Sequence, residues 1–220
     1  MPVKSRPLPA QPTILVIANG KGGVGKTTTA MALSGVFAEQ YKVLAVDADS
    51  QGSFSWWAKQ GGQPLGFDLA QETNPSLLQN LRQVTGYELI IVDTPPALGS
   101  QALAAVVPAA DYLILPTPPA PMDLSALIGT VRETVKPAGV AHRVLLTRVD
   151  TRSLAEAEDA QQTLSELGIP ACRTIVRAYK AHERAALEGV PINQWRGRNA
   201  HIAASDYRLV AQEIQQDWRK

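Results

Sequence analysis

Five short runs of apolar residues, each ended by a glycine, aspartate or proline, recur along the chain. A run of this length with almost no polar position is typical of a strand that is buried on both faces. The runs predict strands over residues 13–19, 42–49, 87–96, 111–119 and 142–150. Between them, apolar residues at helical spacing predict helices over residues 26–39, 123–136, 153–167 and 203–218.

The alternation of strands with helices predicts an α/β fold with a mostly parallel, twisted sheet and helices on both of its faces. We expect a single domain over residues 13–220, preceded by a flexible, proline-rich leader at residues 1–12. Polar residues follow the carboxyl ends of the predicted strands, where sheets of this kind bind their ligands.

The composition narrows the class of protein. A net charge of +1 and a hydrophobic fraction of 45% are ordinary for a soluble globular domain. Residues 171–220 hold nine Lys or Arg and five Asp or Glu, a balance of +4, whereas residues 1–170 hold twelve and fifteen, a balance of −3. The sole cysteine, Cys172, excludes an internal disulfide and argues against an iron–sulfur carrier. No apolar run approaches the roughly 18 residues of a membrane span, so we expect a cytoplasmic protein.

The segment GKGGVGKT at residues 20–27 fits the phosphate-loop pattern G-x-x-x-x-G-K-[ST]. It directly follows a predicted strand and directly precedes a predicted helix, which is the context that this pattern requires. Its glycines allow backbone N–H groups to converge on phosphate oxygens, and the helix N-terminus adds partial positive charge. Lys26 is then expected to reach the β- and γ-phosphates, and the Thr27 hydroxyl to bind Mg²⁺. The alternative is a glycine-rich turn with lysines placed by chance.

A second lysine, Lys21, lies in the same loop. Lys26 already fills the place beside the phosphates, so Lys21 has no obvious use toward a nucleotide bound to its own chain. It is either a solvated loop lysine or a cation that reaches the phosphates held by a second subunit.

These segments resemble the ParA/MinD family of deviant Walker A P-loop ATPases. The loop is similar to the family's KGGVGKTT, residues 46–53 to its first switch, and residues 90–99 to its Walker B strand and second switch. Residues 110–127 and, more loosely, 173–192 resemble later family segments. The chain departs from the family pattern at Gly20, Ser50 and Ser53. It resembles most the small ParA-type partition ATPases that lack an N-terminal DNA-reading domain.

The resemblance implies ATP and Mg²⁺ as cofactors and gives roles to particular residues. Lys21, acting across the dimer, Lys26 and Asp49 are the expected catalytic residues. The expected nucleotide-binding residues form one stretch of the loop: Gly20, Lys21, Gly22, Gly23, Val24, Gly25, Lys26, Thr27 and Thr28.

Three carboxylates lie near the ends of two of the predicted strands. Asp93 ends an apolar run, as the aspartate that holds Mg²⁺ through a water does in phosphate-loop proteins. Asp47 and Asp49 are one residue apart, so an extended backbone would turn them to opposite sides. By resemblance, Asp49 positions the attacking water and Asp47 lies near the metal, which gives Thr27, Asp47 and Asp93 as the metal site. Alternatively, Asp47 only caps a helix. The segment TRVD at residues 147–150 lacks the Asn-Lys pair of Ras-type GTPases, which favours adenine.

The positive balance of residues 171–220 suggests that the protein binds DNA. ParA-like proteins bind nucleoid DNA without sequence preference through basic residues of this region, and dimerisation doubles such a patch. The candidates here are Arg173, Arg177, Lys180, Arg184, Arg196 and Arg198, although a solvated basic face is an equal alternative. MinD-like members end in a membrane-binding helix, but Asp206, Glu213 and Asp217 in the last segment oppose an anionic membrane. That segment is expected to pack on the sheet instead, with no membrane partner.

Together these features predict an enzyme that hydrolyses ATP to ADP and phosphate. The resemblance implies that it dimerises on ATP, associates with nucleoid DNA and positions a cargo when a ParB-like or other adaptor stimulates hydrolysis. Plasmid or chromosome partition is the first interpretation of the cargo. The alternative is a protein cargo, such as a bacterial microcompartment or a chemoreceptor array. A MinD-like membrane regulator or a small-molecule ligase of the same fold is a further, weaker interpretation.

Overall fold

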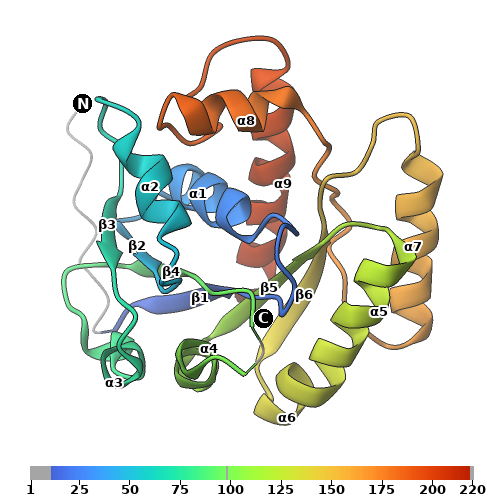
Figure 1. Ribbon diagram of the computed structural model, residues 1–220, viewed down its shortest axis with the longest axis horizontal. Helices are drawn as coiled ribbons and strands as arrows, with labels where there is room; N and C mark the ends of the chain where they lie inside the picture. The colour runs from blue at the N-terminus through green and yellow to red at the C-terminus, as the bar shows by residue number, and fades with distance from the viewer. Residues whose placement is uncertain (1–10, 98, 219–220) are drawn as a thin grey trace.

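The computed structural model describes residues 11–97 and 99–218. Most of the predicted leader and residue 98 of the predicted second switch therefore lie outside the described residues. Six parallel strands form one sheet in the order β3-β2-β4-β1-β5-β6 (Figure 1). The strands are β1 (Thr13–Ile17), β2 (Val43–Asp47), β3 (Asp68–Gln71), β4 (Leu89–Asp93), β5 (Tyr112–Thr117) and β6 (Ala141–Leu146).

Helices connect the strands on both sides of the sheet. The α-helices are α1 (Lys26–Phe37), α2 (Ser53–Lys59), α3 (Pro75–Leu78), α4 (Gln101–Val106), α5 (Pro121–Thr130), α6 (Lys136–Ala138), α7 (Leu154–Glu166), α8 (Lys180–Leu187) and α9 (Ala200–Trp218). A π-helical turn at Val131–Val135 joins α5 to α6, and short 3₁₀ turns lie at Leu81–Gln83 and Val107–Ala109.

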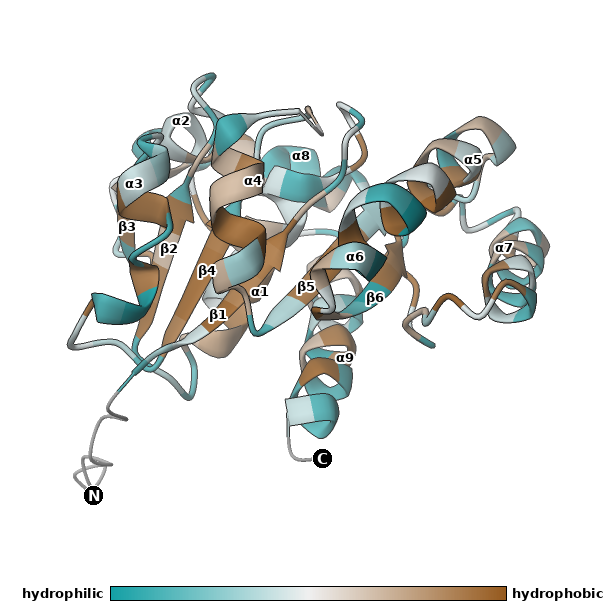
Figure 2. Cartoon of the chain, turned by 90° about the horizontal axis from the view of Figure 1, so that it is seen from below, coloured by the Kyte–Doolittle hydropathy of each residue, from teal (hydrophilic) through white to brown (hydrophobic). Residues whose placement is uncertain are grey.

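Two apolar layers enclose the sheet, because successive strand residues point to opposite faces. Leu15 and Ile17 face a layer built by α1, α2, α8 and α9, which also contains the buried Cys172. Ile14 and Val16 face a second layer built mainly by α4, α5 and α7. Figure 2 shows the strands as the hydrophobic centre between these helices.

The predicted fold is confirmed, with differences at the edges of elements. All five predicted strands are present, and β3 was missed because only Leu69 in it is even partly buried among exposed neighbours. The predicted helix at 123–136 begins at Pro121 and passes into the π-helical turn. The short helices α2, α3, α4 and α8 had no predicted counterpart.

The last helix packs inside the protein, as expected. Phe37 of α1 stacks on Trp218 of α9 with ring centroids 5.5 Å apart, and Arg143 of β6 pairs with Asp217 of α9. Ala203, Val210 and Ile214 of α9 are fully buried. Among the described helices, none is long and apolar enough to cross a membrane.

Candidate nucleotide site

The phosphate loop joins the carboxyl end of β1 to the first residue of α1, as its pattern predicts. Gly23 and Gly25 have φ values of 73° and 93°, a left-handed conformation that glycine adopts without strain. The backbone N–H groups of residues 22–28 have no acceptor within the described part of the chain. Free N–H groups at a helix N-terminus form an anion-binding cradle.

Lys26, the first residue of α1, is buried beneath this cradle, and its side-chain Nζ donates to the carbonyl oxygen of Lys21 at 2.9 Å. Burial lowers the pKa of Lys26, whereas the carboxylates of Asp93 and Asp49 oppose that change. A buried ammonium group with one carbonyl partner is still available to anions. This position is compatible with contact to the phosphates, which stays a prediction.

Asp93 at the end of β4 meets the Thr27 hydroxyl, which donates to its Oδ2 atom at 2.7 Å. The other carboxylate oxygen, Oδ1, is buried and has no hydrogen-bond partner within the described residues. Burial raises the pKa of Asp93 to about 7, although the Thr27 hydroxyl opposes this. A cation beside this unpaired oxygen would offset the loss of solvation of the ionised carboxylate.

These two oxygen donors fit Mg²⁺, which prefers oxygen ligands and is usually held by one or two protein groups together with phosphate and water. Within the described residues, no group of three or more His, Cys, Asp or Glu side chains gathers that could hold a metal. Thr27 and Asp93 thus fit a Mg²⁺ site that a bound triphosphate would complete, and this role stays a prediction.

Asp47 lies beside Asp93 in the parallel register of β2 and β4, but its carboxylate is engaged elsewhere. Its Oδ2 accepts from the backbone N–H of Ser55 at 2.8 Å, and its Oδ1 accepts from that of Asp49 at 3.2 Å. It is fully buried. These bonds hold the segment that leads into α2 and favour the helix-capping alternative, while a role of Asp47 at the metal stays a prediction.

Asp49 lies beyond the end of β2 and is partly exposed. Its Oδ1 accepts from the backbone N–H of Gln51 at 3.0 Å, and its charge acts on Lys26. The environments of Asp47 and Asp49 thus differ, as their spacing predicts. Its position near Lys26 is compatible with the orientation of water, which stays a prediction.

The Lys21 side chain extends from the loop to α5. Its Nζ atom pairs with Asp123 in the first turn of α5 at 2.6 Å, and 44% of its side chain is exposed. The buried Asn19 fixes its backbone, because the Asn19 side chain accepts from the Lys21 N–H and donates to the Pro116 carbonyl. Sequence reasoning missed Asn19 and Asp123, which carry no local motif.

The six basic residues proposed for DNA lie on the segment before α8, on α8 and on the segment before α9, far from the phosphate loop in sequence. Arg173, Arg184, Arg196 and Arg198 are exposed. Lys180 is exposed and pairs with Glu183 at 2.9 Å. Arg177 differs, because its guanidinium group pairs with the buried Asp206 of α9.

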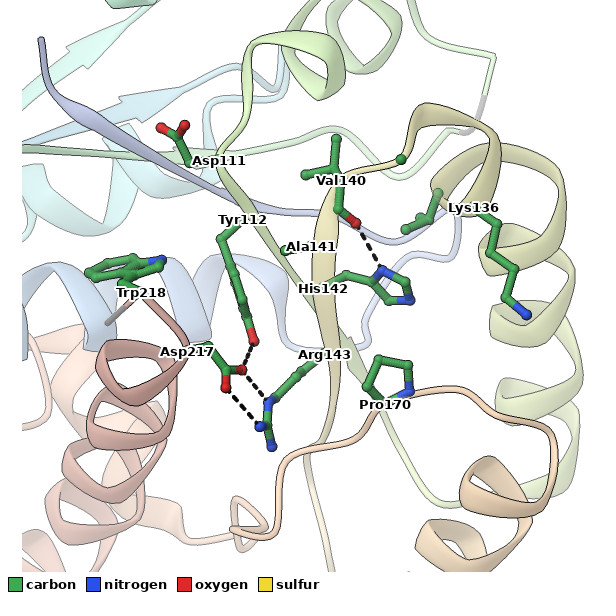
Figure 3. Close-up of a pocket in the computed structure, with 12 residues that line it drawn as sticks. Asp111, Tyr112, Lys136, Val140, Ala141, His142, Arg143, Pro170, Asp217 and Trp218 are labelled. Carbon is green, nitrogen blue, oxygen red and sulfur yellow. Dashed lines mark hydrogen bonds and ion pairs between the residues drawn. The ribbon is translucent and has the colours of Figure 1, made fainter. Parts of the chain in front are cut away.

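A cavity of about 740 Å³ lies at the opposite, amino-terminal ends of β5 and β6. Figure 3 shows Asp217 there between Tyr112 and Arg143, whose side chains both donate to it. Since the phosphate loop follows the carboxyl end of β1, this cavity is separate from the nucleotide site.

Comparison with known proteins agrees with this geometry. Residues 15–204 match the family model "CobQ/CobB/MinD/ParA nucleotide binding domain". Maintenance of carboxysome distribution protein A from Gloeobacter kilaueensis is 64% identical over 97% of this chain and 99% of its own length. The protein of the same name from Halothiobacillus neapolitanus is 31% identical over 91% of this chain and 95% of its own length.

The fold has solved counterparts. The septum site-determining protein MinD of Pyrococcus horikoshii, solved with Mg-ADP, superposes with a TM-score of 0.75 at 24% identity, over 92% of this chain and 95% of that one. The matched family model covers most of the chain and includes the phosphate loop, Asp49 and Asp93. This chain therefore belongs to the CobQ/CobB/MinD/ParA nucleotide-binding family and is an ATPase of the ParA/MinD type.

Proposed function

We propose that this ATPase binds MgATP, dimerises on it and distributes a carboxysome-like protein compartment within the cell. The carrying observation is the 64% identity to a carboxysome distribution protein over nearly the full length of both chains. Of the two cargoes expected from the sequence, it favours the microcompartment over the plasmid or chromosome. Either cargo would be moved by the same general function, that of a ParA-type positioning ATPase.

The described residues support each part of nucleotide binding. The free N–H groups of the loop and the Lys26 ammonium would hold the phosphates, and Thr27 and Asp93 would hold Mg²⁺. A bound Mg²⁺ neutralises phosphate charge and fixes the geometry of the triphosphate. Asp49 would orient the attacking water. The relative from Pyrococcus horikoshii, solved with Mg-ADP, supports this choice of cofactors.

The dimer would form with the phosphate loops facing each other. Two triphosphates that approach across an interface repel, and a cation from each side changes that repulsion into attraction. Lys21 is suited to this role because its side chain is exposed and, within the described residues, its one ion pair is with Asp123 at the surface of the same subunit.

Nucleoid DNA and an adaptor protein would complete the system. Arg173, Arg184, Arg196 and Arg198 are exposed cations that can neutralise DNA phosphates. Arg177 is a weaker candidate because Asp206 already holds it. The adaptor would link the dimer to the compartment and stimulate hydrolysis.

The test is deletion of the gene in its own host, with a fluorescent compartment shell protein and a marked plasmid followed in the same cells. We expect clustered compartments and normal plasmid inheritance. Evenly spaced compartments together with plasmid or chromosome loss would overturn the compartment assignment in favour of partition. Complementation with wild type should restore spacing, and complementation with the Lys26→Ala variant should not.

A further inference from the structure

Two consecutive residues after β6 hold two consecutive carbonyl groups of the phosphate loop. The Thr147 hydroxyl donates to the carbonyl oxygen of Val24 at 2.7 Å. The Arg148 guanidinium, through Nη1, donates to the carbonyl oxygen of Gly23 at 2.6 Å. The segment is 123 to 125 residues from the loop in sequence, so no local pattern links the two.

Each of these bonds fixes the direction of a neighbouring N–H group. In a planar trans peptide, the C=O of one residue and the N–H of the next point in opposite directions. The Gly23 carbonyl points toward Arg148, so the Val24 N–H points away from it. In the same way, the Val24 carbonyl on Thr147 turns the Gly25 N–H outward. Both N–H groups belong to the free cradle described above.

The backbone at Arg148 is held in an unfavourable conformation. Its φ of 54° is left-handed, and Arg148 is one of two such non-glycine residues in the described chain. Side chains other than Asn and Asp rarely adopt it, and it persists where the surroundings over-determine it. Here both neighbours are fixed: the Thr147 N–H donates to Thr117 of β5, and the Val149 N–H donates to Val176.

The side chain of Arg148 binds a backbone carbonyl of the loop, although a carboxylate lies close to it in sequence. Asp150, two residues away, pairs with Arg152 at 2.7 Å. Within the described residues, the one hydrogen bond of the exposed Arg148 is the bond to Gly23. Arg148 thus keeps a left-handed backbone conformation while its side chain binds the loop, and we infer that it acts on the shape of the loop.

We propose that Thr147 and Arg148 are positioning residues for triphosphate binding, which hold the carbonyls of Val24 and Gly23 so that the N–H groups of Gly25 and Val24 face the phosphates. The proposal goes beyond the cargo and concerns the nucleotide site itself. It predicts that these residues act on any polyphosphate, whatever base is attached.

The experiment compares MgATP with magnesium inorganic triphosphate in calorimetry, together with thermal unfolding of the ligand-free protein. Arg148→Gly removes the guanidinium and also the strain, because glycine accepts a positive φ. We expect a melting temperature equal to or above that of wild type and an affinity about tenfold lower for both ligands, the scale of one charged hydrogen bond. A general defect in folding would instead lower the melting temperature together with the affinity.

Three further variants complete the design. Arg148→Lys keeps one charged donor and should recover most of the affinity, to within about threefold of wild type, since a single donor makes the bond. Thr147→Val keeps the shape of the side chain and should weaken both ligands. Arg152→Ala removes an equal charge from the same segment and is the matched control, expected to bind both ligands as wild type does.

Three results would overturn the proposal. Unchanged affinity of Arg148→Gly would show that the loop keeps its shape without the bond. A loss for MgATP but not for triphosphate would mean that Arg148 contacts the base or ribose. An equal loss of affinity in Arg152→Ala would show that the effect comes from the overall charge of the segment.

Discussion

The ammonium group of Lys21 lies 2.6 Å from the carboxylate of Asp123, at the start of α5 in the same chain. The lysine proposed to act across the dimer is therefore engaged by a carboxylate of its own subunit. Since 44% of the Lys21 side chain is exposed, this ion pair is weak and can exchange for another partner. Dimerisation would replace Asp123 with the phosphates of the facing subunit.

Asp123→Asn should strengthen the ATP-dependent dimer, because Lys21 no longer has to leave a carboxylate. An exposed ion pair is worth up to about 1 kcal/mol, and the dimer releases one from each subunit, which limits the gain to roughly thirtyfold in the dimer dissociation constant. The measurement is sedimentation with ATP in an Asp49→Ala background that prevents turnover. Glu133→Gln, at another exposed acid after α5, is the control. A weaker dimer in Asp123→Asn would show that Asp123 itself contributes to the interface.

Lys21→Ala should still bind ATP as a monomer, because Lys26 and the N–H groups of the loop are unchanged. It should fail to dimerise and should lose hydrolysis and tight DNA binding together. Lys21→Arg should also be impaired, because a planar fork does not replace a compact charge in a tight loop. Light scattering with ATP in the same background measures dimerisation. A Lys21→Ala variant that dimerises normally would show that Lys21 is only a charge on the loop.

Substitution of Asp47 should lower the stability of the fold, whereas substitution of Asp49 should slow hydrolysis. Asp47→Ala leaves two backbone N–H groups without their acceptor and should cost about 1–3 kcal/mol of unfolding free energy. Asp49→Ala should change stability by less than about 0.5 kcal/mol while slowing hydrolysis by roughly 10²–10⁴. Urea unfolding and single-turnover kinetics provide the two readouts. Turnover by Asp49→Ala within twofold of wild type would assign the water to another residue.

The basic residues near α8 should also divide into two groups. Arg177→Ala leaves the buried Asp206 without its partner and should destabilise the fold by about 2–4 kcal/mol. Arg184→Ala, at an exposed residue, should leave stability unchanged and weaken ATP-dependent DNA binding, with a smaller salt dependence. Thermal unfolding and DNA binding at several salt concentrations test this. If Arg184→Ala and Arg198→Ala both bind DNA normally, the solvated-face alternative holds.

The parts of the fold and of the site that local sequence patterns encode could be predicted from the sequence. The phosphate loop and Asp93 follow apolar runs directly, so their place at the carboxyl ends of strands could be predicted. The pairs Lys21–Asp123 and Arg148–Gly23 could not, because they join segments far apart in the chain and depend on side-chain reach. Asp47 shows the same limit: the aspartate was singled out, but its bond to Ser55 depends on how α2 packs.

The burial of Cys172 has a practical consequence. It is the chain's sole cysteine, it is 1% exposed, and burial raises the pKa of its thiol. Alkylating reagents attack the thiolate, so the native protein should resist them without any substitution. One cysteine introduced on the surface, for example at Ser165 in α7, would then carry a fluorophore at a known position. A donor and an acceptor attached in this way could report the distance between two subunits as ATP is bound and hydrolysed.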